Sequence, residues 1–423
     1  STAIALPGPP GCADMHPTGE LRGESVRVGG DARQRFHDSR GYGRPLDGNA
    51  IALSRVETAH LLFRGDLAGV TLGDGAGAAG PVGFRRFVAD STAAVDGFFT
   101  RYLVYADLRD RGFYLSPARE PWPGGRADVP DAVDFVAYER GSTPRAGAVE
   151  HPVRVVGERE SIPVDGLSGQ TLAVVDEESD ITYFAAETAD VTGATRYDPP
   201  STLTGEVVGD RVVLWDAPDA LYERGFYGQP LTGRAAAVEG VLQLSLLEAA
   251  SLAADGVLQL TDAPGGVNGV DGVDAADDVS GADDVEAAAT DASRAADPAA
   301  AVATILDRGR SVEGDRFDRR LAVYRALRAR QTVPKTGFKF GADFRTYRDV
   351  DTVDDLPHSA HLVRVVQPGH RFTPRELSLD VRLAGGVRKE LVFAVVDEAG
   401  ARQRGGSTID DAIRWLSVGR LTP

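Results

Sequence analysis

The sequence is poor in cysteine, in methionine and in long apolar segments. Cys12 is the only cysteine among 423 residues, which excludes an internal disulfide and fits a reducing cytoplasm. No apolar run is long enough to predict a membrane span, and the N-terminus lacks the features of a signal peptide. Met15 is the only methionine, so we expect it to be the natural initiator, within a disordered extension over residues 1–18.

Lysine is almost absent. Only Lys335, Lys339 and Lys389 occur, so 43 of the 46 basic residues are arginine, against 63 acidic residues and a net charge of −17. This balance is typical of proteins adapted to high salt, where an acidic surface stays hydrated although screening is severe. A GC-rich genome, which favours arginine codons, is the alternative explanation. In such a chain, a retained lysine is a candidate for a specific role.

The charge is unevenly distributed along the chain. Residues 331–423 contain 14 basic and 12 acidic residues, a balance of +2, so residues 1–330 carry −19. The C-terminal quarter is therefore the part of the chain best suited to contact a polyanion.

Five segments of the first half recur in the second half, which indicates an internal duplication. An insertion at residues 262–298 separates parts of the second copy. It contains ten acidic residues, one arginine and no aromatic residue, and we expect it to form a mobile acidic loop. The matching pairs are Arg40–Pro45 with Arg224–Pro230, Ala52–Glu57 with Gln243–Glu248, Tyr105–Arg111 with Tyr324–Arg330, Asp134–Tyr138 with Asp343–Tyr347, and Leu172–Glu177 with Phe393–Glu398.

The duplication predicts an α+β protein of two tandem diverged repeats. Each repeat is expected to begin with a small α/β subdomain, made of short strands and a helix after a Leu-Ser cap, and to end with a mixed-sheet domain that opens with an amphipathic helix. The expected boundaries are 19–95 and 96–190 in the first repeat, then 203–310 and 311–423 in the second.

The last domain shows a clear order of predicted elements. After the amphipathic helix come a strand hairpin around Thr336–Gly341, then a strand at Asp343–Tyr347 and another at Leu362–Val366. Thr373-Pro-Arg-Glu376 predicts a helix start with a capping box, and Leu377, Val381 and Ala384 form its apolar face. Gly385-Gly386 is expected to end this helix, before a buried strand at Leu391–Val396.

Three polar residues of this domain suit the cleavage of RNA without a metal ion. RNA carries its own nucleophile in the 2′-hydroxyl. Tyr347 could remove its proton, since a neighbouring cation at Lys389 would favour the phenolate over the neutral form. His358 could protonate the departing 5′-oxygen, and Lys389 could stabilise the charge that develops on the phosphorane. Each residue alone is weak evidence, but the three in these contexts together favour catalysis.

The contexts of these residues resemble the archaeal tRNA-splicing endonuclease family in its fused-repeat form. The resemblance covers nearly the whole chain from residue 19 and departs mainly at the acidic insertion. It implies a nuclease-like C-terminal domain, a homodimer, Tyr347, His358 and Lys389 as catalytic triad, and precursor tRNA with a bulge-helix-bulge as substrate. The segments that carry it are Thr336–Gly341, Asp343–Arg348, Val353–Ser359, Val381–Lys389 and Leu172–Phe184.

The first repeat retains only part of the triad. Tyr138 matches Tyr347, but alignment of the two copies puts Ala148 opposite His358 and Ser168 opposite Lys389. The first repeat is therefore expected to be catalytically degenerate, which leaves one active site in each chain. The same alignment pairs His361 with His151 of the degenerate copy, so we expect a structural role for His361.

The resemblance also implies binding residues. Arg382 and Arg420 match a pair that clamps a flipped base, as guanidinium planes stack on bases. The acidic turn with Asp176, Glu177 and Glu178 resembles the loop that inserts into a cleft of the partner subunit. For each of these residues the alternative is an ordinary solvated side chain.

Other signals carry less weight. Gly75–Gly80 fits a dinucleotide-binding pattern, but Pro81 follows and no long helix is predicted there. His358 and His361 lack further ligands for zinc. We therefore expect no metal, no cofactor, no DNA substrate and no membrane partner. Two alternatives stay open, a non-catalytic RNA-binding or assembly subunit of the same family and a general metal-independent ribonuclease.

Overall fold

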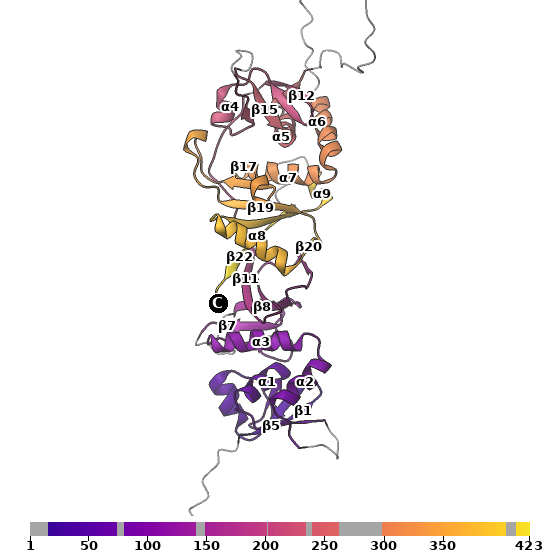
Figure 1. Cartoon of the computed structure of the whole chain (residues 1–423), viewed down its shortest axis with the longest axis vertical. Coiled ribbons are helices and arrows are strands. Elements are labelled where there is room, and N and C mark those ends of the chain that lie inside the picture. The colour runs from indigo at the N-terminus through magenta and orange to yellow at the C-terminus, as the bar shows by residue number, and fades with distance from the viewer. Residues whose placement is uncertain are drawn as a thin grey trace, which may run out of the picture. The chain divides into compact units, whose positions relative to one another are not determined.

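A strand that leads through a serine cap into a short helix occurs twice in the structure (Figure 1). Ser54 and Ser245 accept the backbone N–H of the glutamate three residues on, and those glutamates, Glu57 and Glu248, accept the backbone N–H of the serine at 2.7 and 3.0 Å. Both are capping boxes, which confirms the predicted Leu-Ser caps. The elements are β4 (Ile51–Ser54) with α1 (Arg55–Phe63), and β15 (Leu242–Ser245) with α5 (Leu246–Ala254).

The structure is a computed structural model that describes residues 16–73, 80–140, 149–200, 202–233, 239–261, 298–402 and 412–423. It divides into two units, one formed by residues up to 187 with 371–381 and 418–423, the other by 188–370 and 382–417. Residues 1–15 and 262–297, and with them most of the predicted extension and acidic insertion, lie outside the described residues. The prediction of disorder was wrong for Pro17 and Thr18, because the Pro17 carbonyl accepts the Ala68 N–H and Thr18 begins a paired strand.

Each unit contains a small sheet that carries its capped helix. The strand orders are β3-β4-β2-β1-β5 and β14-β15-β13-β12-β16, and in both sheets the last pair is parallel and the others antiparallel. The strands are β1 (Thr18–Arg22), β2 (Ser25–Val28), β3 (Arg44–Pro45), β5 (Gly69–Leu72), β12 (Leu203–Val208), β13 (Arg211–Leu214), β14 (Gln229–Pro230) and β16 (Leu258–Leu260).

Each unit also contributes a larger mixed sheet. The strand order is β6-β7-β8-β10-β11 in the first unit and β17-β18-β19-β21-β22 in the second, and the pairs β8–β10 and β19–β21 are parallel. The strands are β6 (Tyr114–Pro117), β7 (Phe135–Tyr138), β8 (Val149–Gly157), β10 (Gln170–Val175), β11 (Ile181–Thr188), β17 (Val333–Thr336), β18 (Phe344–Tyr347), β19 (His361–Val366), β21 (Glu390–Val396) and β22 (Ile413–Leu421).

The two larger sheets share one register. Tyr138 pairs with Tyr114 as Tyr347 pairs with Val333, and each residue that precedes these tyrosines pairs with a histidine, His151 or His361. Val153 pairs with Thr171 in the first sheet, and the equivalent Val363 pairs with Val392 in the second. Thr171 and Val392 are therefore equivalent, and the residues three positions before them, Ser168 and Lys389, are equivalent too. The backbone therefore agrees with the alignment of the sequence.

Amphipathic helices cover these sheets as predicted. In α7 (Arg316–Ala329), Phe317, Tyr324 and Leu327 are fully buried against Phe344 and Val363, and α3 (Phe98–Asp110) has the same role in the first unit. Two helices were not predicted, α2 (Phe84–Ala94) and α6 (Pro298–Glu313). Among the described residues, no helix is long and apolar enough to cross a membrane. The remaining short elements are η1 (Arg33–Asp38), α4 (Asp219–Glu223), η3 (Phe338–Phe340), η4 (Val353–Asp355), α9 (Glu398–Ala401), β9 (Ile162–Pro163) and β20 (Arg371–Phe372).

The helix α8 (Pro374–Gly386) begins and ends where it was predicted. Thr373 and Glu376 exchange the hydrogen bonds of a capping box, and the predicted apolar residues Leu377, Val381 and Ala384 are buried. Gly385 and Gly386 are the last two residues of the helix, as predicted. The left-handed residue that ends the helix is Arg388, with a φ of 56°, because the hydrogen bonds that close the last turn form around it.

Candidate active site

The candidate catalytic residues lie at one edge of three neighbouring strands. Tyr347 ends β18, and the next strand begins beside it, since the Ala360 N–H donates to the Thr346 carbonyl oxygen at 2.8 Å. The Glu390 N–H then donates to the Ala360 carbonyl oxygen at 3.0 Å. Tyr347, the segment that contains His358, and Lys389 therefore meet at the same end of β18, β19 and β21.

Tyr347 is held in a small apolar cluster. Its side chain is only 5% exposed and packs with those of Phe226, Val333 and Val350. The Arg345 guanidinium lies 5.7 Å from the centre of the Tyr347 ring. The ring is therefore fixed by packing, as a group that must hold one orientation requires.

Lys389 follows directly from the end of α8. The Lys389 N–H donates to the Ala384 carbonyl oxygen at 2.9 Å, and the Arg388 N–H donates to that of Gly385 at 3.0 Å. These two bonds form a Schellman motif around the left-handed Arg388. The half-buried Lys389 side chain donates to the Val387 carbonyl oxygen at 3.1 Å and lies 5.4 Å from the Phe340 ring centre. Its ammonium is thus directed by backbone geometry.

His358 and His361 have different surroundings. His358 is exposed in the loop before β19, next to the buried Ser359. His361 is 1% exposed, with its Nδ1 atom 2.8 Å from Thr346 Oγ1 and its Nε2 atom 3.8 Å from Glu390. Burial lowers the pKa of His361. The exposed histidine is free to reach a substrate, whereas the buried one is engaged in the sheet.

The equivalent edge of the first unit differs in its polar residues. Tyr138 is 1% exposed, and burial raises its pKa, although Arg126 and Ser116 act in the opposite direction. His151 lies 3.4 Å from Thr171 Oγ1, and burial lowers its pKa too. Ala148 lies outside the described residues. Since Ser168 stands against Lys389, this edge has the tyrosine without the cation.

The predicted binding residues are exposed. Arg382 lies on the exposed side of α8, and Arg420 lies near the end of β22. Both guanidinium groups are therefore accessible from solvent. Each remains a candidate for RNA binding.

The carboxylates of the acidic turn between β10 and β11 have different contacts. Asp176 accepts the N–H groups of Glu178 and Asp180, both at 2.9 Å, and so shapes the turn itself. Glu177 forms an ion pair with Arg159 at 2.5 Å. Glu178 is exposed to solvent. Of the three predicted interface residues, Glu178 is therefore best placed to meet another molecule.

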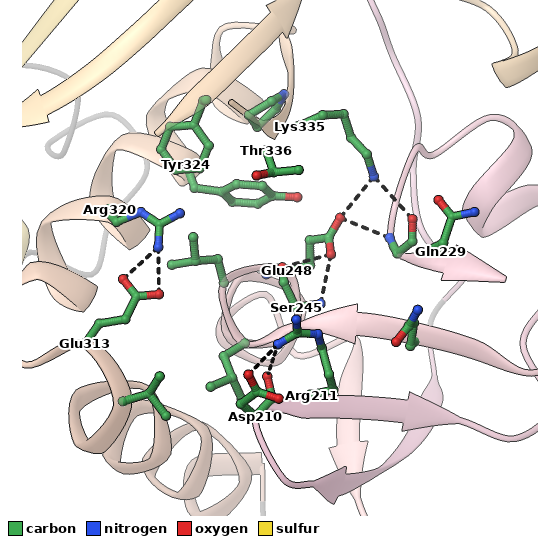
Figure 2. A pocket seen from close by; sticks show the side chains of 17 residues that line it. Asp210, Arg211, Gln229, Ser245, Glu248, Glu313, Arg320, Tyr324, Lys335 and Thr336 are labelled. Atoms are coloured by element: carbon green, nitrogen blue, oxygen red, sulfur yellow. Dashed lines mark hydrogen bonds and ion pairs between the residues drawn. The ribbon is translucent and has the colours of Figure 1, made fainter. Parts of the chain in front are cut away.

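Lys335 was not predicted as a functional residue. It borders a cavity of about 380 Å³ next to α5 and β17 (Figure 2). Its Nζ atom lies 3.3 Å from Glu248 Oε1 and donates to the carbonyl oxygens of Phe226 and Gly228 at 2.9 and 3.2 Å. The scarcity of lysine was the signal that could have identified it.

Lys335 contributes to a lowered pKa of the buried Glu248 carboxyl. Burial acts to raise the pKa of Glu248, but Lys335 and backbone N–H donors outweigh it, so this pKa is lowered. In the first unit the matching Glu57 accepts the Trp122 indole N–H at 3.2 Å instead. Burial prevails there and raises the pKa of Glu57. The second unit therefore holds a buried ion pair where the first has a neutral donor.

The described residues contain no group of three or more His, Cys, Asp or Glu side chains that could hold a metal ion. The glycine-rich segment at 75–80 lies outside the described residues except for Gly80. Tyr347, His358 and Lys389 are side chains of the types that serve acid, base and electrostatic roles.

Comparisons with known proteins cover nearly the whole chain. The model of the tRNA intron endonuclease catalytic C-terminal domain matches residues 317–403, and that of the N-terminal domain matches residues 18–79 and again 203–268. A tRNA-splicing endonuclease of Halobacterium salinarum is 53% identical over 96% of this chain and 99% of its own length. Those of Haloferax volcanii and Methanosarcina mazei are 51% and 32% identical over 96% and 95% of this chain, and 99% and 98% of their own lengths. The halophilic relatives agree with the expectation from charge composition.

Proposed function

This chain belongs to the tRNA-splicing endonuclease family and contains its catalytic domain, and we propose that it excises introns from precursor tRNA by cutting at bulge-helix-bulge splice sites. Each cut leaves a 2′,3′-cyclic phosphate and a 5′-hydroxyl. The reaction takes place in the cytoplasm and uses no metal ion. DNA, which lacks the 2′-hydroxyl, is not a substrate.

The convergence of three backbone segments carries this proposal. The end of β18, the loop before β19 and the junction of α8 with β21 lie at one sheet edge, and these segments carry the phenol of Tyr347, the imidazole of His358 and the ammonium group of Lys389. Those three groups are what cleavage by an internal 2′-hydroxyl requires, namely a base, an acid and a fixed positive charge.

The reaction assigns one role to each group. Tyr347, as phenolate, accepts the proton of the 2′-hydroxyl, and the 2′-oxygen bonds to the adjacent phosphorus. Lys389 stabilises the additional negative charge on the phosphorane. The bond from phosphorus to the 5′-oxygen then breaks, and His358 donates a proton to that oxygen. The phosphate is left bridged between the 2′- and 3′-oxygens, so atoms and charge balance without water.

The repeated registers support an origin of the chain in a tandem duplication. On this reading the first repeat is catalytically degenerate, because Ser168 stands where the second repeat has Lys389. A homodimer then carries two active sites, one for each end of an intron. Glu178, exposed on the acidic turn, contributes to the contact between the subunits, and Asp176 maintains the shape of that turn.

RNA recognition is assigned to two arginines. Arg382 and Arg420 are exposed, and their planar guanidinium groups stack on a base that leaves the helix. Stacking of this kind contributes about 1–3 kcal/mol for each base. The positive balance of the C-terminal quarter supports contact with the RNA backbone.

The test is cleavage of an intron-containing precursor tRNA by the purified protein, in molar KCl with EDTA, followed by analysis of the RNA ends. Two cuts with 2′,3′-cyclic phosphates are expected, and a matched substrate with a 2′-deoxy sugar at each splice site should stay intact. A folded protein that leaves the RNA uncut would contradict the proposal. Equal cleavage of unstructured RNA would instead indicate a general ribonuclease.

A further inference from the structure

Phe226 has an unusual backbone conformation beside the candidate base. Its φ is 57°, in the left-handed region that residues with a Cβ atom rarely adopt. The side chain is only 2% exposed and belongs to the same apolar cluster as Tyr347 and Val333. An unfavourable conformation is therefore maintained at a residue of the small apolar cluster that holds Tyr347.

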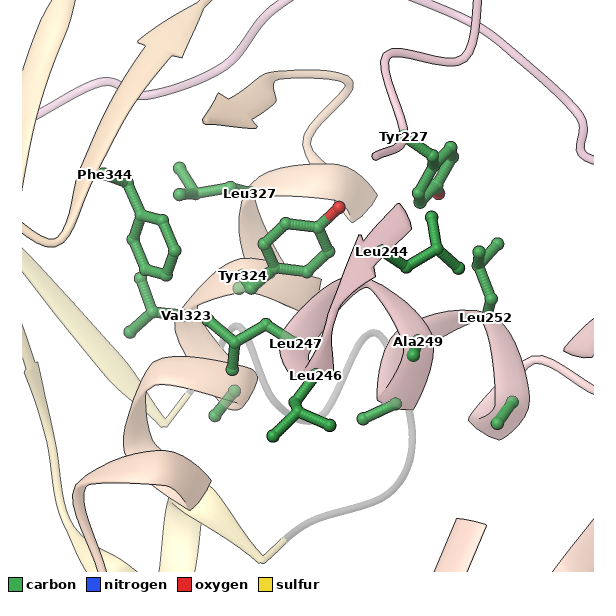
Figure 3. Packing of buried hydrophobic residues seen from close by; sticks show 14 of the residues in the cluster. Tyr227, Leu244, Leu246, Leu247, Ala249, Leu252, Val323, Tyr324, Leu327 and Phe344 are labelled. Atoms are coloured by element: carbon green, nitrogen blue, oxygen red, sulfur yellow. The ribbon is translucent and has the colours of Figure 1, made fainter. Parts of the chain in front are cut away.

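Two cations hold this conformation. The Phe226 carbonyl oxygen accepts hydrogen bonds from Lys335 Nζ at 2.9 Å and from Arg328 at 3.3 Å. Arg328 also donates to the Gly225 carbonyl oxygen at 2.9 Å, and its guanidinium lies 4.1 Å from the centre of the Tyr227 ring. Tyr227 and Tyr324 lie in the same core cluster (Figure 3), so this anchor rests on well-packed side chains.

The first unit has glycine at the matching position. Gly43 donates its N–H to Glu57 as Gly228 donates to Glu248, at 2.6 and 3.0 Å. Counting back two residues from each glycine sets Gly41 against Phe226, and Gly41 also has a positive φ, of 69°. The backbone turn is therefore shared, but only the second unit places a ring in it.

The arginine contacts support this alignment of the two units. Arg109 donates to the Arg40 carbonyl oxygen at 3.0 Å, as Arg328 does to that of Gly225 at 2.9 Å. The guanidinium of Arg109 lies 4.1 Å from the centre of the Tyr42 ring, the same distance as for Arg328 over Tyr227.

Lys335, like the Phe226 ring, has no counterpart at the matching position of the first unit. The registers of the two larger sheets set Ser116 of β6 against Lys335 of β17. The first unit thus has the arginine and the turn, but neither the lysine nor the ring. The conformation of this turn favours glycine. The presence of phenylalanine at position 226 is therefore not explained by the turn. Strained residues often occur at functional sites, and Phe226 shares its apolar cluster with Tyr347.

We propose that Phe226 is a positioning residue for Tyr347: held by Lys335 and Arg328, its ring forms a wall that keeps the phenol in the orientation required to accept the 2′-hydroxyl proton. This inference rests on the proposed function of Tyr347 as base. It makes the N-terminal part of the second repeat a component of the active site, although it supplies no catalytic group.

The test compares Phe226→Gly with Phe226→Leu in the full-length protein. Glycine suits the left-handed turn and reproduces the first unit, so the fold is retained while the wall is lost. With precursor tRNA under single-turnover conditions, we expect the rate at saturation to fall about 10- to 100-fold, as for a small displacement of a reacting group. The RNA concentration for half-saturation should stay unchanged. Phe226→Leu, which keeps apolar bulk, should recover most of the rate.

Two further variants separate positioning from general loss of structure. Gln331→Gly relieves another left-handed residue of the second unit, with a φ of 59°, and should leave the rate unchanged. In a Tyr347→Phe background, adding Phe226→Gly should leave the residual rate unchanged, because the two residues act as one unit.

The outcomes distinguish this inference from the proposed function. If the unaltered protein cleaves the RNA and a folded Phe226→Gly variant cleaves it equally fast, Phe226 is not a positioning residue. An equal further loss in the Tyr347→Phe background would also overturn the inference, since Phe226 would then act independently of Tyr347. If the unaltered protein leaves the RNA intact, the proposed function fails first, and this inference fails with it.

Discussion

Replacement of Lys335 by methionine should destabilise the second unit. Lys335 forms an ion pair with Glu248 and donates to two carbonyl oxygens, and the Lys335 and Glu248 side chains are only 23% and 10% exposed. Loss of one partner of a buried pair costs about 3–5 kcal/mol. Because Lys335 retains some exposure, we expect the lower end, about 3 kcal/mol. For a unit of this size, that corresponds to a fall in Tm of about 6–12 °C.

The loss should depend on pH in a defined direction. The pKa of Glu248 is lowered in the folded protein, so the stabilisation by the pair is fully present above the unfolded-state pKa, about 4.3. It is lost as the pH falls through the lower folded-state value. The difference between the unaltered protein and the variant should therefore be largest near neutral pH and should narrow on acidification.

Thermal unfolding of the unaltered protein and Lys335→Met over a range of pH, in constant molar KCl, measures both effects. The matched control is Trp122→Phe, which removes a neutral donor from the equivalent Glu57 and should cost only about 1–2 kcal/mol. A Lys335→Met loss no larger than that of the control would refute the reasoning. So would a loss of equal size at about pH 3 and about pH 7.

Three other changes have defined outcomes. Lys389→Ala should lower the rate of precursor tRNA cleavage by at least about 100-fold with little change in Tm, and near-normal cleavage would remove Lys389 from the mechanism. Arg388→Gly should relieve the left-handed conformation at the end of α8 and stabilise the protein by about 1 kcal/mol; a lower Tm in calorimetry would contradict this. Glu178→Lys should weaken self-association in sedimentation equilibrium, whereas an unchanged dimer would place Glu178 outside the subunit contact.

Signals between residues close in the sequence predicted structure well. Ser54 with Glu57, and Thr373 with Glu376, form the predicted capping boxes because both partners lie within one helical turn. The buried residues of α8 follow from helical spacing in the same way. Gly385-Gly386 end that helix as predicted, whereas the left-handed residue after it is Arg388, because glycine is common in such turns but not required there.

Contacts between distant segments could not be predicted. Phe226 joins the apolar cluster of Tyr347, and Lys335 contacts Glu248, across more than eighty residues of chain. No periodicity or capping pattern connects such positions, because the contact depends on how a sheet and a helix pack. Only the scarcity of lysine marked Lys335 beforehand.

The sequence by itself determined the family, the internal duplication of its motifs and the identity of the three candidate catalytic residues, because each depends on residue types and their order. The tertiary structure decided how those residues are supported. Strand register brings Tyr347, the His358 loop and Lys389 to one edge, and long-range packing places Phe226 in the same apolar cluster as Tyr347. Register and packing arise only when segments distant in the sequence bury their apolar surfaces together.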